Sequence, residues 1–294
     1  MLAQGILMGI SMGLLQFPAL GAVLQYFDKK RAAAMGVVVS GSSIGGIITP
    51  IAVSKMLNGS SLGFGWSVRI VGFMMLPFVA VALLTITARL PPKKTAFWLP
   101  SAYRDPTFAL LIISLLFSFM GIFMPLFFIP TYAVSRGMDP ILAGDLSAIL
   151  NAASTFGRII PGVLADKYGR LNVYALGGIL SSIVIFCMNS ATTNAGLIVY
   201  SIAIGFTTGT IISGATSAFS MCSKDPREMG TYMGMGMFVA AFGGLIGPPV
   251  NGVFISHFGG FFQVSMFSGA MTLLGGGLVV LAKFTTPQGL LGRV

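Results

Sequence analysis

One charged side chain inside an apolar stretch is the first candidate for chemistry. Arg158 falls within Ala148 to Arg170, which is long and apolar enough to cross a bilayer as a helix. An unpaired guanidinium is so costly there that its presence suggests a function. Its planar fork could bind a substrate carboxylate through two hydrogen bonds. Alternatively, the side chain snorkels to the membrane surface, because Asp166 is only eight residues, or ~12 Å of helix, further on.

Three polar residues share the helix face of Arg158. Asn151, Ser154 and Thr155 lie seven, four and three residues before it, a spacing that places side chains on one side of an α-helix. We interpret these residues, with Arg158, as a candidate substrate-binding site. Serine and threonine also serve contacts between membrane helices, so both interpretations stay open. A second stretch carries four hydroxyls that suit a cavity wall or helix packing equally: Thr207, Thr208, Thr210 and Ser213.

The other ionisable residues do not complete a reactive site. Asp145 lies 13 residues before Arg158, or ~20 Å along a helix, so the two cannot pair, and Asp145 is interpreted as an outer-end or gate residue. His257, the lone histidine, is interpreted as a solvated turn residue. The sequence has no histidine in plausible reach of a Cys or Ser nucleophile, no carboxylate pair within an apolar stretch and no phosphate loop. We therefore predict that the protein is not an enzyme and uses no cofactor or metal.

The composition defines the elements that must position these residues. Hydrophobic residues make up 55% of the 294-residue chain, charged residues make up 8%, and the mean hydropathy is +0.91. Soluble domains carry about one-quarter charged residues, so the chain is predicted to be an integral membrane protein in contact with the lipid bilayer. The net charge of +10 does not indicate nucleic-acid binding, because basic residues gather on the cytoplasmic side of membrane proteins.

Nine apolar segments have the length of a membrane-spanning helix. They lie at about Leu2–Leu24, Ala32–Leu57, Val68–Ala88, Thr107–Pro130, Ile141–Leu164, Asn172–Ser190, Ala195–Met221, Met229–Ile255 and Phe261–Ala282. Only Lys55, Arg69 and Arg136 fall on one side of these segments. The larger group of basic residues is therefore predicted to be cytoplasmic, with the N-terminus outside and the C-terminus inside. This group is Lys29, Lys30, Arg31, Arg89, Lys93, Lys94, Arg104, Lys167, Arg170, Lys224, Arg227, Lys283 and Arg293.

Two further sequence patterns predict where helices begin and where they pack closely. Three pairs combine an N-cap carboxylate with a proline suited to the first helical position: Asp105-Pro106, Asp139-Pro140 and Asp225-Pro226. Glycines at four-residue spacing predict faces on which helices approach closely, as at Gly41 with Gly45, Gly205 with Gly209 and Gly243 with Gly247.

The loop after the Arg158 helix carries a family motif. Gly162 to Arg170 reads Gly-Val-Leu-Ala-Asp-Lys-Tyr-Gly-Arg, which resembles the loop signature G-x-L-A-D-[RK]-x-G-R of the major facilitator superfamily. The resemblance implies an all-α integral membrane fold of that superfamily and makes Asp166, Lys167 and Arg170 a gating latch at the cytoplasmic face. An internal repeat agrees with it, because Met35-Gly36 after Arg31 is echoed 194 residues later by Met229-Gly230 after Arg227.

The superfamily has twelve helices, and the nine segments match its helices 4–12. This implies a partial N-terminal half of three helices at residues 1–90, a cytoplasmic loop between the halves at 91–106, and a complete C-terminal six-helix half at 107–294. Helices one to three would be missing, and a truncated gene model is the preferred explanation.

Within the superfamily the sequence resembles the monocarboxylate transporters, especially their fungal members. The matching segments are Tyr26 to Ser42, Gly157-Arg158 with Gly162, and Gly247-Pro248-Pro249 with Gly252. The resemblance implies a secondary transporter of monocarboxylates or similar small organic anions, coupled to a proton, that works by alternating access. One departure is Ser154, which stands where animal members usually have an aspartate.

Two alternatives to small-anion transport remain open. The protein could export a larger hydrophobic secondary metabolite, an alternative that the lack of an aspartate at Ser154 favours. It could also be a truncated membrane fragment that does not transport. The plasma membrane is the expected location, with the vacuole or another internal membrane as the alternative.

Overall fold

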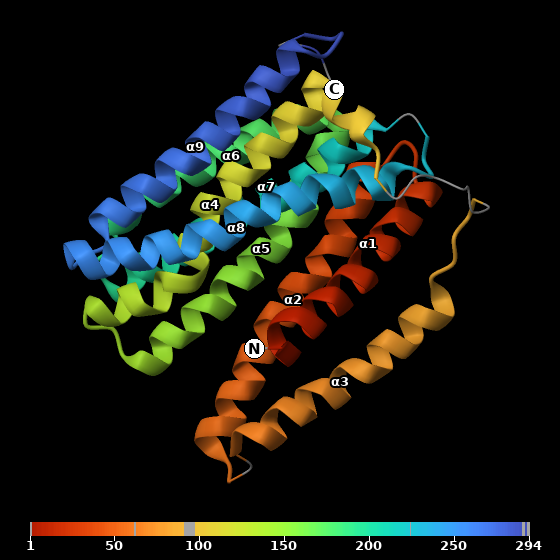
Figure 1. Cartoon of the computed structure of the whole chain (residues 1–294). Coiled ribbons are helices and arrows are strands. Elements are labelled where there is room, and N and C mark those ends of the chain that lie inside the picture. Colours follow the sequence, from red (N-terminus) through yellow and green to blue (C-terminus); the bar gives the residue numbers. More distant parts are fainter. Residues whose placement is uncertain (1, 62, 91–97, 224, 290–291, 293–294) are drawn as a thin grey trace.

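The computed structural model describes residues 2–61, 63–90, 98–223, 225–289 and 292 (Figure 1). Within these residues nine α-helices are long and apolar enough to cross a membrane, which confirms the predicted all-α fold with nine spans. They are α1 (Met8–Tyr26), α2 (Arg31–Gly59), α3 (Gly63–Thr85), α4 (Pro106–Ser135), α5 (Pro140–Tyr168), α6 (Arg170–Phe186), α7 (Asn194–Cys222), α8 (Met229–Phe258) and α9 (Phe262–Phe284). Short helices of other types cover Leu2–Leu7, Pro100–Arg104 and Cys187–Ser190.

Two of the three Asp-Pro pairs begin a membrane helix as predicted. The Asp105 carboxylate accepts a hydrogen bond from the Thr107 amide at 2.9 Å, and α4 begins at the proline between them. Asp139 caps α5 in the same way, through the Ile141 amide at 2.9 Å. Asp225 accepts from the Arg227 amide at 3.0 Å, but α8 begins only at Met229, so the prediction that this pair starts a helix is wrong and the pair forms a turn before it.

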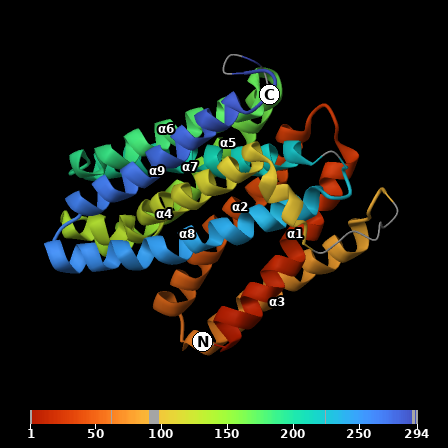
Figure 2. The same ribbon diagram turned by 45° about the horizontal axis from the view of Figure 1, so that its top comes forward.

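Helices α4–α9 form a bundle, and α1–α3 lie along one side of it (Figure 1, Figure 2). Two buried apolar clusters hold the bundle together, one around Phe108 and Phe219 and the other around Tyr132 and Leu146. Helix α2 packs along α5 and α1 packs against α8, whereas α3 contacts α2 and stands at the edge of the molecule. The predicted division into halves stays a prediction, and residues 91–97 of the loop between them lie outside the described residues.

Glycines bring pairs of helices into backbone contact. A Cβ atom on Gly209 of α7 would lie 2.7 Å from the carbonyl oxygen of Ser154 on α5. A Cβ atom on Gly247 of α8 would lie 2.5 Å from the carbonyl oxygen of Met120 on α4. The prediction of close approach is thus confirmed for these two spacings, and it is wrong for Gly41 and Gly45, whose Cβ positions have no described neighbour within 4 Å.

Basic residues gather at one end of the bundle, which we call the basic end. Those that the structure describes there are Lys29, Lys30, Arg31, Arg89, Arg104, Lys167, Arg170, Arg227 and Lys283. Lys93, Lys94, Lys224 and Arg293 lie outside the described residues. Lys55, Arg69 and Arg136 lie at the opposite end. The charge asymmetry behind the predicted orientation is therefore a property of the folded chain, and the cytoplasmic position of the basic end stays a prediction.

Tyr132 gives a test of the six-helix bundle. Its fully buried hydroxyl donates to the carbonyl oxygens of Met188 at 3.1 Å and Ala191 at 3.2 Å, and so ties α4 to the turn after α6. Tyr132→Phe is expected to destabilise the protein by about 1 kcal/mol or more, because a buried hydrogen bond is lost. Thermal unfolding in detergent measures this effect, with exposed Tyr168→Phe as the control. Equal unfolding midpoints for the two variants would contradict the structural role.

Candidate functional site

Arg158 is buried at the contact between α5 and α2. Its side chain is 7% exposed, and Nη1 donates to the carbonyl oxygen of Val39 at 2.7 Å and to the Ser42 hydroxyl. Its Nε atom is buried without a hydrogen-bond partner among the described residues. Arg158 forms no ion pair with a described carboxylate. The guanidinium therefore crosses to the neighbouring helix and does not snorkel to the basic end.

The helices around Arg158 meet through backbone atoms. A Cβ atom on Gly162 of α5 would lie 2.8 Å from the carbonyl oxygen of Ala32 and 3.4 Å from the Cα atom of Gly36. Gly36 itself lies against the carbonyl oxygen of Arg158, which also accepts a hydrogen bond from the Ser213 hydroxyl of α7 at 3.1 Å. We call this contact the α2–α5 seam; its residues are Ala32, Gly36, Val39, Ser42 and Gly46 on α2, and Asn151, Arg158, Gly162 and Asp166 on α5.

The polar residues predicted to share a site with Arg158 do not all face the same way. Asn151 lies at the α2–α5 seam, where a Cβ atom on Gly46 would be 2.6 Å from its Oδ1 atom. Ser154 is buried against Gly209 of α7. Thr155 is half-buried and donates to the carbonyl oxygen of Asn151 in its own helix at 3.2 Å. Asn151 and Arg158 of α5 therefore both face α2, and a substrate-binding role for the set stays a prediction.

The remaining polar candidates have simpler places in the fold. Asp145 is exposed near the start of α5, and His257 is exposed in the last turn of α8. Thr210 donates to the carbonyl oxygen of Gly157 at 3.3 Å, and Ser213 donates to that of Arg158. These two hydroxyls of α7 therefore serve helix packing against α5, one of the two uses left open by the sequence.

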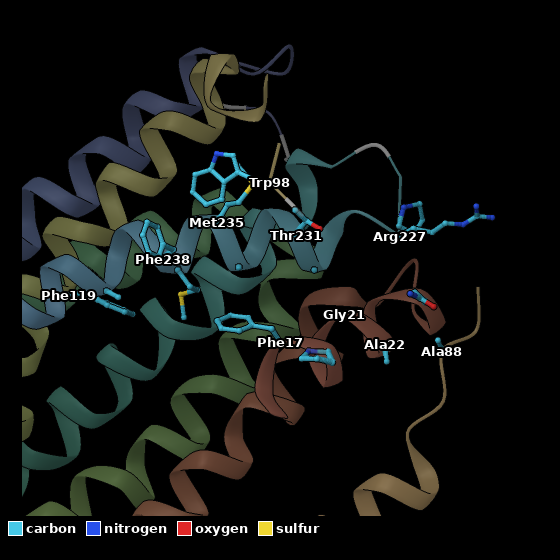
Figure 3. Close-up of a pocket in the computed structure, with 17 residues that line it drawn as sticks. Phe17, Gly21, Ala22, Ala88, Trp98, Phe119, Arg227, Thr231, Met235 and Phe238 are labelled. Atoms are coloured by element: carbon cyan, nitrogen blue, oxygen red, sulfur yellow. The ribbon is translucent and has the colours of Figure 1, made fainter. Parts of the chain in front are cut away.

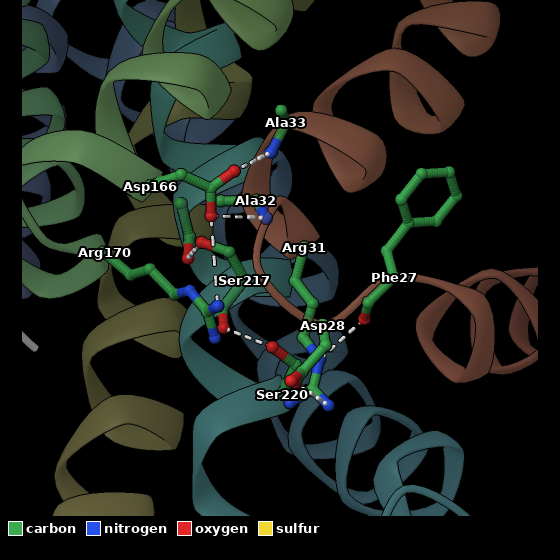
Figure 4. Close-up of polar contacts among 10 residues, drawn as sticks. Phe27, Asp28, Arg31, Ala32, Ala33, Asp166, Arg170, Ser217 and Ser220 are labelled. Carbon is green, nitrogen blue, oxygen red and sulfur yellow. Dashed lines mark hydrogen bonds and ion pairs between the residues drawn. The ribbon is translucent and has the colours of Figure 1, made fainter.

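Asp166 joins the end of α5 to the start of α2 (Figure 4). Its two carboxylate oxygens accept hydrogen bonds from the amides of Ala32 at 3.1 Å and Ala33 at 2.9 Å. Helix α2 has no side-chain cap of its own from the preceding residue, Lys30. A carboxylate at a helix N-terminus satisfies free amides and interacts favourably with the helix dipole. Asp166 is thus a cap supplied by another helix.

Arg170 and Lys167, predicted as latch partners of Asp166, contribute differently. An Arg170 nitrogen lies 3.9 Å from an Asp166 oxygen, which makes a long ion pair (Figure 4). Lys167 is exposed and lies over the ring of Tyr168 at 5.3 Å. Of these three residues, Asp166 is the one with a described hydrogen bond to α2. The latch role of all three residues stays a prediction.

The hydrogen bonds and close glycine contacts described between α2 and α5 lie in the half of α2 nearest the basic end. They run from Ala32 to Gly46. In Figure 1 the far end of α2 turns away from the far ends of α4 and α8. Along the α2–α5 seam the chain is therefore closed at the basic end, and α2 diverges from the bundle toward the opposite end.

An apolar cleft lies between α1 and α8 at the basic end (Figure 3). Its volume is about 1220 Å³, and its walls include aromatic and methionine side chains such as Phe17, Phe119, Met235 and Phe238. Trp98 closes one side, with its ring 5.9 Å from that of Phe238 in an edge-to-face contact. A cleft of this size and lining suits a hydrophobic organic molecule.

The cleft has few polar groups. Arg227 is the ionisable residue among the described lining residues, and its side chain extends away from the others in Figure 3. The side-chain oxygen of Gln25 accepts a hydrogen bond from the Leu90 amide at 3.0 Å. Next to Trp98, burial raises the pKa of the Tyr103 hydroxyl, so that group stays neutral. The cleft was not found from the sequence, because its residues come from α1, α4, α8 and a loop and share no periodic pattern.

A family model and curated proteins match this chain over nearly its whole length. The family model described as Major Facilitator Superfamily matches residues 1–160 and 111–292. The chain is 48% identical to the aspyridones efflux protein apdF of Emericella nidulans over 288 residues, which are 98% of this chain and 59% of that protein. It is 37% identical to the agnestins efflux protein AgnL12 of Paecilomyces divaricatus over 99% of this chain and 66% of that protein. The chain thus spans about three-fifths to two-thirds of the length of these relatives.

A solved structure shows the same fold. The fucose:proton symporter of E. coli superposes with a TM-score of 0.72 at 14% sequence identity, covering 92% of this chain and 73% of the symporter. At this identity the likeness concerns the fold alone. The helices, the Gly162–Arg170 loop and the match to the family model agree, and the chain belongs to the Major Facilitator Superfamily.

Proposed function

We propose that this protein is a transporter that exports a hydrophobic secondary metabolite by alternating access. The observation that carries the proposal is the likeness to two efflux proteins, 48% and 37% identical over nearly the whole chain. Export from the cell requires the plasma membrane, with the basic end in the cytoplasm. The substrate would then be an organic molecule larger and less polar than a small monocarboxylate.

The apolar cleft supports this substrate class. A hydrophobic molecule gains about 25 cal/mol for each Å² of apolar surface removed from water, and the aromatic walls of the cleft offer such surface. The cleft lies between α1 and α8 at the end that would face the cytoplasm, and the α2–α5 seam contributes none of its described lining residues. A small hydrophilic carboxylate would find no charged group turned toward it among the described lining residues.

The burial of Arg158 against α2 supports a role in helix contact. Its side chain is 7% exposed, and Nη1 donates to the Val39 carbonyl oxygen and to the Ser42 hydroxyl of α2. Asp145 is exposed and lies far from Arg158 along α5, so the residues offer no acid beside the arginine for a coupling proton. We infer that Arg158 stabilises the α2–α5 seam in the state that is closed at the basic end.

Uptake by inside-out vesicles from cells that express the full chain tests the function. Vesicles with the protein are expected to accumulate aspyridones, the compounds named for the 48% identical relative, faster than vesicles without it, and to ignore radiolabelled lactate. Lactate uptake that depends on pH would favour the small-anion alternative. Transport of neither compound would favour a fragment that does not transport.

Arg158 variants separate the two substrate classes. Arg158→Lys is expected to keep most export activity, because an ammonium can still donate to the Val39 carbonyl and the Ser42 hydroxyl. Arg158→Ala is expected to lower it, because hydrogen bonds from a charged donor are worth about 1.5–3 kcal/mol. The measurement is transport per molecule of protein in the membrane. If the lysine variant failed as completely as the alanine variant, a planar fork for a carboxylate would be the better explanation.

Phe238 tests whether the cleft binds the substrate. Phe238→Ala is expected to weaken apparent affinity for aspyridones about 2- to 10-fold, because an aromatic contact contributes about 0.5–1.5 kcal/mol beyond its buried area. Phe258→Ala is the matched control, since this residue is also exposed on α8 but lies outside the cleft. Concentration dependence of vesicle uptake gives the comparison. Equal effects of the two substitutions would exclude the cleft as the binding site.

A further inference from the structure

A second cavity opens at the basic end beside the α2–α5 seam. It has a volume of about 430 Å³ and is lined by Lys29, Ala165, Asp166, Lys167, Gly169, Arg170, Met221 and Gln288. Lys29 comes from the turn between α1 and α2, whereas Lys167 and Arg170 come from α5 and α6. The cavity therefore collects three cationic side chains from both sides of the seam.

The single carboxylate of this cavity is already engaged. Both oxygens of Asp166 accept hydrogen bonds from the first amides of α2, and its contact with Arg170 is long, at 3.9 Å. Neither Lys29 nor Lys167 forms an ion pair with a described carboxylate. Like charges around one cavity repel each other, and an anion placed among them would remove that repulsion. The cavity therefore has the charge and the room for a ligand that the chain itself does not supply.

We propose that this cavity binds a phosphate ester, supplied by the headgroup of an anionic phospholipid. The inner leaflet of a membrane carries anionic lipids that attract lysines and arginines near its surface. Lys29, Lys167 and Arg170 lie at the helix ends that would face that leaflet. Lys and Arg are the usual partners of phosphate oxygens, Lys as a point charge and Arg as a fork.

A bound phosphate would act on both sides of the α2–α5 seam at once. Lys29 precedes α2, and Lys167 and Arg170 flank the end of α5 that carries Asp166. An anion that contacts both groups adds an attraction between the two parts of the molecule in the state closed at the basic end. When the seam opens, the two groups separate and this attraction is lost. The ligand therefore stabilises the closed state, independently of which substrate is exported.

Thermal unfolding of the purified chain in detergent tests the site. Short-chain phosphatidic acid is expected to raise the unfolding midpoint more than short-chain phosphatidylcholine at equal concentration. Lys29→Gln and Lys167→Gln are each expected to weaken the apparent affinity for phosphatidic acid about fivefold, since a basic residue near an anionic surface contributes about that factor. Lys55→Gln, an exposed lysine at the opposite end, is the matched control and should leave the affinity unchanged.

Further ligands distinguish a lipid headgroup from a soluble phosphate ester and show which results would contradict the proposal. Glycerol 3-phosphate that binds as tightly, with the same sensitivity to Lys29→Gln and Lys167→Gln, would support the phosphate-ester site and assign it to a soluble ligand. Equal stabilisation by phosphatidic acid and phosphatidylcholine would overturn the proposal. An affinity for phosphatidic acid that is unchanged in both single variants would overturn it as well. These two lysines are exposed, so the variants are expected to fold.

Discussion

Gly36→Ala is expected to destabilise the protein by about 1–3 kcal/mol, whereas Gly41→Ala, five residues further along the same helix, is expected to be neutral or slightly stabilising. The difference arises from the α2–α5 seam. A Cβ atom on Gly36 would be forced against the carbonyl group of Arg158, which is backbone and cannot rotate away. A Cβ atom on Gly41 has no described neighbour within 4 Å. In an exposed position alanine is the better helix former.

The pair of variants is measured by thermal unfolding in the same detergent. The two substitutions add the same methyl group to the same helix, so general effects on membrane insertion cancel. A lower unfolding midpoint confined to Gly36→Ala would establish that α2 and α5 touch through their backbones. Gly162→Ala should behave like Gly36→Ala, because its Cβ atom would lie 2.8 Å from the Ala32 carbonyl oxygen. Unaltered stability in both seam variants would mean that the two helices do not meet in this way.

Asp166→Ala is expected to shift the protein away from the state closed at the basic end. The substitution leaves the amides of Ala32 and Ala33 without their acceptor and removes a negative charge from the N-terminus of α2. Losing a helix cap costs about 0.5–2 kcal/mol, so the ratio of open to closed molecules should rise about 2- to 30-fold. Asp166→Asn keeps one acceptor oxygen without the charge and should fall between wild type and alanine.

Spin labels at Lys30 and Tyr168 report this equilibrium, because both residues are exposed and lie on either side of the contact made by Asp166. Cys187 and Cys222 must first be replaced, since both are free thiols. A distribution of distances that broadens toward longer values in Asp166→Ala is the expected result. Asp28→Ala is the control, because that carboxylate is 87% exposed and pairs with Arg31 of its own segment. A shift of the same size in Asp28→Ala would refute a specific role for Asp166.

The sequence predicted the fold better than the site. Nine spans, two of the three helix-starting Asp-Pro pairs and several close glycine contacts follow from local composition and spacing, and the structure has them. The hydrogen bonds of Arg158 to α2 could not be predicted from the sequence. Helical spacing indicates which residues share a face of α5 but not which helix lies opposite that face. Val39 and Ser42 lie more than a hundred residues before Arg158, and only the fold brings them together.

Ser154 shows the same limit on a smaller scale. Its four-residue spacing from Arg158 is correct for one face of α5, yet that face is broad enough to be divided between two neighbours. Ser154 lies against Gly209 of α7 while Asn151 and Arg158 lie against α2. Periodicity alone cannot separate these directions, because a shift of one residue along a helix turns a side chain by about a quarter of a turn.

The apolar cleft and the α2–α5 seam are built on different helices, and this separation has a consequence for how such a protein can change over time. The aromatic and methionine side chains of the cleft belong to α1, α4, α8 and a loop, whereas the contact that closes the basic end uses glycines, backbone carbonyls and amides of α2 and α5. Replacing Phe238 or Met235 alters the shape offered to a molecule without touching the groups that hold the two parts together. If the proposed export function holds, substitutions in α8 alone would change which molecules the cleft accepts and leave the contacts of α2 with α5 unaltered.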